Sequence, residues 1–390
     1  MLPSSDDKDE LGWLDQQQQP MLELLEQIVN IDSNSYDFEG VDAVGNAIKA
    51  HLETRGIETE IIPRPNAGYC LIAKVRAAET EENAKPILLM GHRDTVFPKG
   101  EAARRPFRVE AGKAYGPGIA DMKSGLVMNC FVAEAFHRSG TNAHPINVLF
   151  TSDEEIGSPS SRPVIEAMAR SAAYVFNSEP GRPSGNIVRG RKGAWFSTIK
   201  VEGVAAHSGA AHQHGASAIR ALCRKVEALE QLTEYETGIT ANVGLIRGGQ
   251  SMNTVPPSAE CSIDIRYKSA ADLAAIETAV SEIVERIDVD RTTAQFDPPT
   301  VFLPFELTPG NQLLFQQYQE ASANLGITVD GDYSGGAADS GFTSALGIPT
   351  LCAVGPIGER GHQPDEAIDI ESLVPRAKAI TATILGLGND

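Results

Sequence analysis

Residues 88–98 read LLMGHRDTVFP, an apolar run that stops at Gly91 and is followed at once by His92, Arg93 and Asp94. A short apolar run bounded by turn-forming residues is typical of a buried strand. Because side chains alternate along an extended segment, His92 and Asp94 are expected to point the same way. Ligands of open α/β sheets gather at the carboxyl ends of strands. The stretch therefore predicts a strand exit with two polar groups facing a site, although such a pair taken alone is more often a simple hydrogen bond.

Strand-like and helical patterns alternate on both sides of this stretch, as in an α/β sheet with covering helices. The strand-like runs are residues 57–62, 69–75, 86–91, 146–152, 172–178 and 349–355. Helical spacing of apolar residues is expected from 20, around 44–52, from 123, near 160–170, over 311–326 and from 372.

Residues 192–303 have a self-contained order of elements. The expected elements are a strand at 194–203, a helix at 216–232, strands at 241–249 and 259–267, a helix at 271–287 and a strand at 292–296. This βαββαβ order is that of a ferredoxin-like α+β domain. We therefore predict an α/β domain formed by residues 1–191 and 304–390, interrupted by an inserted domain at 192–303.

Composition excludes several classes of partner. The chain has 390 residues, with 33 Lys and Arg against 52 Asp and Glu, a formal net charge of −19. Such a surface repels nucleic acid and anionic membranes, so neither is an expected partner. The start of the chain is acidic and polar, and no stretch is long enough to span a bilayer, so we expect a cytoplasmic protein.

The five cysteines include no CxxC pair and are expected to be buried, reduced side chains.

Four further acidic residues follow strand-like runs or precede a helix: Asp121, Glu154, Glu155 and Glu179. One such acid alone is more simply a helix N-cap or a solvated loop charge. Several acids at one edge of a sheet repel each other and raise each other's pKa unless a cation lies among them. His362, in a glycine-rich loop, could reach the same edge.

A donor set of imidazoles and carboxylates without sulfur suits two zinc ions, although cobalt or manganese could occupy it. Five ligands for two ions require one bridging carboxylate. Asp94 is placed to accept the free ring N–H of His92. Of the adjacent Glu154 and Glu155, one can bind metal while the other takes a proton from a water. The five expected ligands are His92, Asp121, Glu155, Glu179 and His362.

Nine short motifs between residues 91 and 370 resemble, in order, those of the co-catalytic zinc peptidases and deacylases, the family of carboxypeptidase G, aminoacylase and succinyl-diaminopimelate desuccinylase. The resemblance implies a mixed-sheet zinc-peptidase catalytic domain with an inserted ferredoxin-like domain that serves as lid and dimer contact. It also implies a homodimer. The motifs are GHRDTV, GPGIADMKSG, TSDEEIGS, SEP, GVAAHSG, SMNTVP, DIRY, GGAADSG and GHQPDEAIDI.

The resemblance also implies individual roles, which spacing alone does not assign. It implies a cis peptide bond after Asp121. The implied roles are His92 and Glu179 on one zinc, Glu155 and His362 on the other, Asp121 as the bridge, Glu154 as general base and Asp94 as the partner of His92.

The inserted domain and a later glycine loop supply the implied substrate groups. His207 would stabilise the oxyanion in the partner subunit's site, with the help of Asn253, and Arg266 would bind a substrate carboxylate. Read without the resemblance, His207 is a simple loop histidine. Gly335 and Gly336 would let backbone amides approach that carboxylate.

The implied reaction is hydrolysis of an amide bond that releases an amino acid with a free carboxylate, as from a small peptide or an N-acyl amino acid. Members specific for glutamate commonly carry a hydroxyl residue before the Asp of the glycine loop, whereas here Ala338 precedes Asp339. An N-acyl amino acid deacylase or dipeptidase is therefore an alternative. A non-catalytic metal-binding protein is the alternative of another class. A dinuclear phosphatase is disfavoured by the net charge and the lack of a phosphate-binding Gly-Lys loop.

Overall fold

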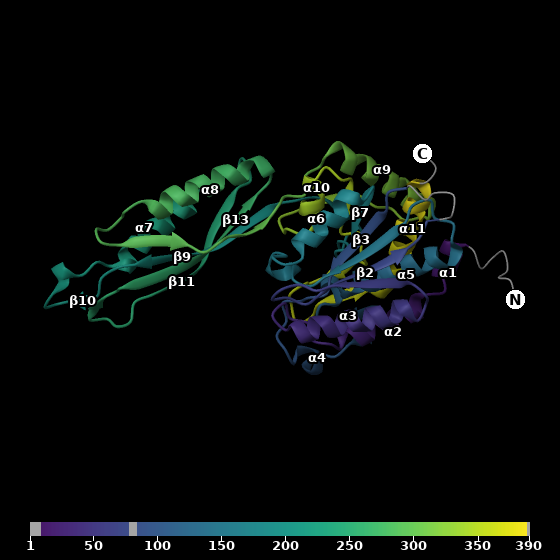
Figure 1. Ribbon diagram of the computed structural model, residues 1–390, viewed down its shortest axis with the longest axis horizontal. Helices are drawn as coiled ribbons and strands as arrows, with labels where there is room; N and C mark the ends of the chain where they lie inside the picture. Colours follow the sequence, from purple (N-terminus) through teal and green to yellow (C-terminus); the bar gives the residue numbers. More distant parts are fainter. Residues whose placement is uncertain (1–8, 78–83, 388–390) are drawn as a thin grey trace. The chain divides into compact units, whose positions relative to one another are not determined.

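The structure is a computed structural model that describes residues 9–77 and 84–387 (Figure 1). The described chain divides into two compact units. Unit 1 comprises the residues up to Gly190, Leu307–Tyr333 and the residues from Phe342 onwards, and unit 2 comprises Arg191–Glu306 and Ser334–Gly341.

The centre of unit 1 is an eight-stranded mixed sheet. In chain order its strands are β1 (Glu58–Ile62), β2 (Cys70–Val75), β3 (Ile87–His92), β6 (Ile146–Thr151), β7 (Tyr174–Asn177), β8 (Ile187–Arg191), β16 (Gly331–Ser334) and β17 (Thr350–Cys352). Across the sheet the order is β1-β2-β6-β3-β7-β17-β8-β16. β3 pairs in parallel with β6 and with β7, whereas β2 pairs antiparallel with β1 on one side and with β6 on the other. The carboxyl ends of β3, β6 and β7 therefore lie at one edge.

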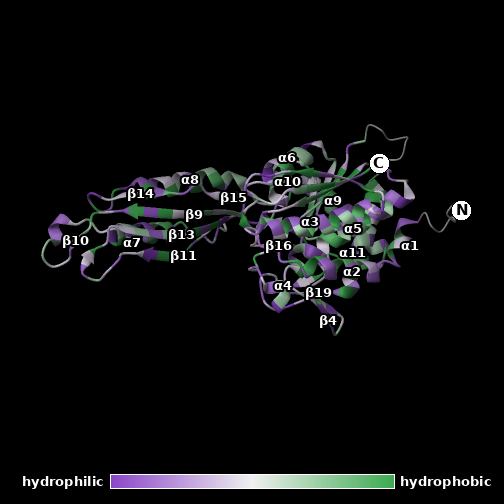
Figure 2. Ribbon diagram, turned by 60° about the horizontal axis from the view of Figure 1, so that its bottom comes forward, coloured by the Kyte–Doolittle hydropathy of each residue, from purple (hydrophilic) through white to green (hydrophobic). Residues whose placement is uncertain are grey.

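Helices cover both faces of this sheet. Leu71, Leu89 and Val148 belong to the main apolar core, which also contains buried residues of α2, α3, α5, α9 and α11. Cys70 points the other way and its Sγ lies 3.5 Å from Ser161 Oγ, at the start of α6. Figure 2 shows residues of both hydropathies on α2 and α11, as expected for helices with one buried face. α5, in contrast, is buried all round from Ser124 to Phe136. The helices are α1 (Glu10–Leu14), α2 (Gln18–Val29), α3 (Phe38–Glu53), α4 (Glu101–Arg104), α5 (Ser124–Ser139), α6 (Arg162–Ser171), α9 (Pro309–Asn324), α10 (Ser340–Ala345) and α11 (Leu373–Leu387).

A second, four-stranded antiparallel sheet lies in unit 1. Its strands are β4 (Arg108–Glu110), β5 (Lys113–Tyr115), β18 (Gly358–Glu359) and β19 (Ala367–Asp369), in the order β18-β19-β5-β4. β19 pairs with β5, so that Ala367 lies opposite Tyr115. This pairing brings the segment after His362 against the segment that leads to Asp121.

Unit 2 is an antiparallel sheet with two helices on one face (Figure 1). Side chains of both helices share one apolar core with the inward-facing side chains of the strands. Ser269 and Asp272 form a capping box at the start of the second helix. The elements are β9 (Gly193–Glu202), α7 (Ala218–Glu230), β11 (Thr240–Gly248), β13 (Ser258–Tyr267), α8 (Ala270–Glu285), β14 (Thr293–Phe296) and β15 (Thr300–Phe302), with a two-stranded ladder of β10 (Ala206–His207) and β12 (Thr254–Val255).

The predicted fold class is confirmed. In the sheet of unit 2 the strands lie in the order β11-β13-β9-β14, and along the chain the helices α7 and α8 follow β9 and β13. This is the ferredoxin-like arrangement. Unit 2 is larger than the predicted inserted domain at 192–303, because it also contains Arg191 and residues 304–306, and because residues 334–341 return to it. The backbone accounts for the return of residues 334–341, since Lys192 N–H donates to Ser334 O at 3.0 Å.

The five cysteines are free, but Cys223 is exposed, so the expectation of burial is wrong for that residue. Cys223 follows the buried Leu222 on the amphipathic helix α7 and faces away from the core.

Residues 1–8 of the polar start of the chain lie outside the described residues. Within the described residues, no helix is both long enough and apolar enough to cross a bilayer.

Candidate active site

The exits of three parallel strands bring the predicted acids together. His92 is the last residue of β3 and lies opposite Thr151 of β6, and Glu154 and Glu155 follow in a short helical turn after that strand. Glu179 comes two residues after β7. Because β3 lies between β6 and β7 in the sheet, all these side chains start from the same edge.

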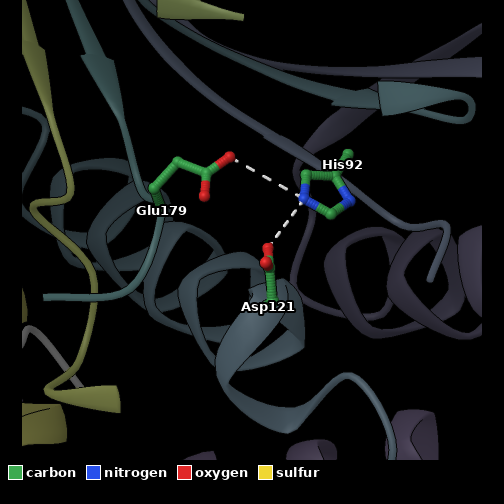
Figure 3. Close-up of side chains that lie close together, drawn as sticks. All are labelled: His92, Asp121 and Glu179. Atoms are coloured by element: carbon green, nitrogen blue, oxygen red, sulfur yellow. Dashed lines mark hydrogen bonds and ion pairs between the residues drawn. The ribbon is translucent and has the colours of Figure 1, made fainter. Parts of the chain in front are cut away.

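Asp121 joins His92 and Glu179 in a first group of three (Figure 3). His92 Nε2 lies 3.1 Å from Asp121 Oδ1 and 3.7 Å from Glu179 Oε1. Asp121 comes from the irregular segment before α5, and the peptide bond between Asp121 and Met122 is cis, as the resemblance implied.

Asp121 also belongs to a second group, with Glu155 and His362. His362 Nε2 lies 3.3 Å from Asp121 Oδ2 and 3.1 Å from Glu155 Oε2. The two oxygens of Asp121 therefore face two different histidines. Oε1 of Glu155 is buried and has no hydrogen-bond partner among the described residues. A buried carboxylate oxygen without a partner is costly, and a metal ion would satisfy it.

Asp94 holds the ends of two strands in place. His92 Nδ1 lies 2.9 Å from Asp94 O and 3.4 Å from Asp94 Oδ1, so it donates in this direction while Nε2 faces the acids. The Asp94 carboxylate also accepts the backbone N–H groups of Glu154 and Glu155, both at 3.1 Å, and the Ser35 hydroxyl at 2.7 Å. One buried carboxylate thus orients a histidine and the turn that carries both glutamates.

Electrostatics within the cluster favour bound cations. Burial opposes a charge on His92, but hydrogen bonds with Asp121 and Asp94 outweigh it and raise the pKa of His92 well above its ordinary value. Contacts with Asp121 and Glu155 raise the pKa of His362 to about 10. Burial, followed by the charge of Asp121, raises the pKa of Glu155 to about 7. Metal ligands must be deprotonated, so binding of ions here displaces protons, and affinity rises with pH. The donor set fits two divalent ions.

The sequence analysis missed two buried charged residues beside this cluster. Arg93 is fully buried and donates to Thr151 O, Val41 O and Tyr69 O, which ties β3 to the end of β6. Glu366 accepts three backbone N–H groups from the segment that carries Asp121. Burial raises the pKa of Glu366 to about 8. Both residues lie within quoted motifs, Arg93 in GHRDTV and Glu366 in GHQPDEAIDI, and this position was the available signal for each.

The first turn of α5 packs against the backbone next to Glu179. A Cβ added to Gly125 would lie 2.0 Å from Ser178 O. We expect Gly125→Ala to lower the free energy of unfolding by about 1–3 kcal/mol, the usual cost of overpacking, as measured by urea denaturation. Gly386 of α11 is the matched control, because its added Cβ meets nothing within 4 Å. If both variants unfold at the same urea concentration, this contact does not constrain the strand exit.

The predicted substrate residues all belong to unit 2. His207 and Asn253 are neighbours, because His207 pairs with Thr254 across the β10–β12 ladder and Ser208 N–H donates to Asn253 O at 3.0 Å. His207 is exposed, and its Nδ1 accepts the backbone N–H groups of Gly209 and Ala210, both at 3.1 Å. In the neutral ring the proton is therefore on Nε2.

Arg266 projects from β13 on the face of the sheet opposite the helices. Its Nε and Nη2 donate to the two oxygens of Asp264, at 2.7 and 3.0 Å, and its guanidinium lies 4.9 Å from the centre of the Phe196 ring. Gly336 N–H donates to Ser334 Oγ at 3.1 Å. An added Cβ at Gly335 meets nothing within 4 Å, so space alone does not require a glycine there.

The chain matches the peptidase family M20/M25/M40 over residues 88–386. The match covers the whole of unit 2 and, in unit 1, residues 88–190, 307–333 and 342–386. The protein belongs to this family. The family resemblance, the fold class and the prediction of an enzyme that hydrolyses amide bonds are thereby confirmed.

Named relatives cover nearly the whole chain. Carboxypeptidase G2 of Pseudomonas sp. (strain RS-16) is 29% identical over 380 residues, which are 95% of this chain and 90% of that protein. Acetylornithine deacetylase of Proteus mirabilis is 27% identical over 353 residues, which are 86% of this chain and 87% of that protein. The relatives thus include both a carboxypeptidase and a deacylase.

Solved structures show the same fold. A metallo-carboxypeptidase of the M20 family from Sulfolobus solfataricus has a TM-score of 0.73 at 20% identity, covering 94% of this chain and 99% of that chain. A Bacillus subtilis protein described as a dinuclear metal binding peptidase of the M20 family has a TM-score of 0.65 at 16% identity, covering 95% and 98%. The fold of the M20 peptidases is therefore that of this chain.

Proposed function

We propose that this metallohydrolase uses two zinc ions to cleave an amide bond and release an amino acid with a free carboxylate, as a carboxypeptidase G-like enzyme acting on a C-terminal glutamate or a similar residue. The observation that carries the proposal is the pair of three-residue groups that share Asp121. His92 and Glu179 would hold one ion, and Glu155 and His362 the other. Cobalt or manganese fits the same donors.

Bound divalent ions supply Lewis acidity towards the substrate carbonyl and lower the pKa of a water. Glu154 is the group we assign as general base. Its Oε2 lies 3.9 Å from His92 Nε2, and its backbone is held by Asp94. Glu154 takes a proton from the attacking water as the new C–O bond forms. It then delivers that proton to the leaving nitrogen as the C–N bond breaks.

His207 is suited to stabilise the oxyanion in the partner subunit's site. Because its Nδ1 accepts two backbone N–H groups, its Nε2–H is the free donor, and the ring orientation is fixed in advance. Preorganised donors stabilise developing charge at little cost. Asn253, held beside it by the ladder, would assist.

Arg266 is suited to bind the carboxylate of the released amino acid. Asp264 occupies the side of the guanidinium formed by Nε and Nη2. Nη1 and Nη2 present a second pair of N–H groups in the plane of the guanidinium. This pair can donate to the two oxygens of a substrate carboxylate. The ring of Phe196 lies near the guanidinium and restrains that plane. Gly335 and Gly336 would add backbone amides.

A deacylase or dipeptidase is the second candidate, and Ala338 favours it. Ala338 is buried at the position where glutamate-specific members commonly carry a hydroxyl group. A glutamate side chain would therefore lack one hydrogen bond in this protein. The acetylornithine deacetylase relative is consistent with this second candidate.

A homodimer formed through unit 2 stays a prediction, as does the cytoplasmic location. β11 forms an edge of the unit 2 sheet, and its Leu245 and Ile246 are 59% and 56% exposed. Exposed apolar side chains on a sheet edge are suited to pairing with a second chain. This edge supports the dimer proposal.

Metal removal combined with a substrate panel tests the proposed reaction. Chelator-stripped protein is reloaded with zinc, and hydrolysis of folate-like, acyl-Glu, acyl-Asp, acyl-aromatic and dipeptide substrates is measured. Each substrate has a matched control with its carboxylate capped as an amide. We expect activity to vanish on stripping, to return with zinc, to be highest on acyl-Glu compounds and to be low on capped ones.

Two outcomes would count against parts of this proposal. Fastest hydrolysis of acyl-aromatic substrates or dipeptides would favour the second candidate. Equal hydrolysis of capped and uncapped substrates would contradict carboxylate recognition by Arg266.

A further inference from the structure

Glu366 contacts the metal-binding segment without being a ligand in either group of three. It is 1% exposed and lies four positions after His362, just before β19. Its Oε1 accepts the backbone N–H groups of Ala120 and Asp121 at 2.7 and 2.9 Å, and its Oε2 accepts that of Gly118 at 3.1 Å. One carboxylate therefore accepts hydrogen bonds from three amides within four residues.

The segment that Glu366 holds is irregular. Asp121 and Met122 have non-helical backbone angles, and Gly118 has a φ of +72°. Amides in such a segment have no strand or helix ladder to join, and buried amides without partners are costly. The pairing of β19 with β5 places Glu366 next to these amides. The segment thus takes its shape from an acceptor that comes from a distant part of the chain.

Asp121 is the residue whose orientation matters most in the cluster. Its Oδ1 faces His92 at 3.1 Å and its Oδ2 faces His362 at 3.3 Å. A small rotation of the backbone would move both oxygens at once. The same chain segment, residues 362–366, supplies a ligand of one group and the anchor of the residue shared by both groups.

We propose that Glu366 is a positioning residue of the metal centre, which fixes the backbone of Asp121 so that its two oxygens serve two ions together. Loss of this carboxylate weakens binding of the second ion more than binding of the first. The inference rests on the proposed dinuclear centre, but it concerns metal binding and not the substrate.

The test is zinc binding by Glu366→Gln, measured by competition with a chromophoric chelator on stripped protein. Glutamine keeps the size but puts an NH2 group against a backbone N–H, so that at least one of the three hydrogen bonds is lost. We expect the second zinc to bind about 10- to 100-fold more weakly, the range known for outer partners of metal ligands. Glu359→Gln is the matched control, because Glu359 lies in β18, which pairs with β19 directly after Glu366, and its carboxylate pairs with Lys113.

A double-variant comparison separates positioning from general destabilisation. In an Asp121→Asn background, Glu366→Gln should weaken zinc binding little further, because both changes act through one residue. Additive losses, or unchanged binding of both ions by Glu366→Gln, would overturn the proposal. If Glu366→Gln does not fold, Glu366→Asp keeps the charge with a shorter reach, and wild-type affinity for both ions in that variant would also overturn it. Zinc binding is read without any substrate, so failure of the proposed reaction on the panel would be seen separately.

Discussion

The Glu154→Gln variant is expected to lose turnover by about 10²- to 10⁴-fold, the contribution of a general acid–base group, while still binding two metal ions. Glu154 is in neither group of three, although its Oε2 lies 3.9 Å from His92 Nε2. Its backbone N–H bond to Asp94 is unaffected by the change. The amide cannot accept the proton of the attacking water. The loss is measured as kcat on the best substrate of the panel, alongside zinc stoichiometry.

The neighbouring residue supplies the control for this prediction. Glu155→Gln removes a carboxylate that contacts His362 at 3.1 Å, so it should lower both turnover and the affinity for one ion. The two variants differ by one position in the same turn, which separates proton transfer from metal binding. If Glu154→Gln keeps most of the wild-type rate, another residue is the base. If it loses an ion, Glu154 is a ligand.

The strand exits were predictable because they depend on local rules. Apolar runs that end in His92, Glu154 and Glu179 predict buried strands, and parallel strands place their carboxyl ends at one edge. The structure confirms the α/β class and the ferredoxin-like order of unit 2. The roles at the cluster came from the family resemblance, since repulsion among acids indicates a cation but does not say which carboxylate bridges.

Other features depend on contacts between distant segments, which periodicity does not report. β17 lies between β7 and β8, although more than 150 residues separate it from both. Residues 334–341 belong to unit 2 because their backbone meets that of Lys192. In the sequence Glu366 is one more acidic residue in a loop. Its role becomes visible only when the irregular backbone whose N–H groups it accepts is known.

Buried charges are the other limit of the sequence analysis. Arg93 lies between two site residues and would be taken for a solvent-facing charge, yet it is fully buried. Gly45 makes room for it, since an added Cβ there would lie 1.8 Å from Arg93 Nη1. The need for a small residue at Gly45 of α3 follows from the long side chain of Arg93 at the end of β3, and it is visible only when these two elements are packed together.

Asp121→Asn is expected to disrupt binding of both ions. Each oxygen of Asp121 faces a different histidine, at 3.1 and 3.3 Å, so one change affects both groups. An amide has one acceptor oxygen and no charge, so it cannot bridge two cations as a carboxylate does. We expect zinc affinity to fall by more than the roughly 10- to 100-fold typical of an outer partner, and turnover to fall with it.

The measurement for Asp121→Asn is zinc content after dialysis, together with chelator competition at fixed pH. Asp297→Asn is the control, because Asp297 is a carboxylate of unit 2 that pairs with the exposed Lys200 and should leave the zinc content unchanged. Excess zinc distinguishes two explanations for lost activity. Recovery of most of the rate at high zinc would mean that Asp121 only raises affinity, whereas a persistent deficit would mean that its bridging geometry is needed for the reaction itself. Retention of two tightly bound zinc ions in Asp121→Asn would contradict the shared-ligand arrangement, because neither group of three would then depend on the carboxylate that joins them.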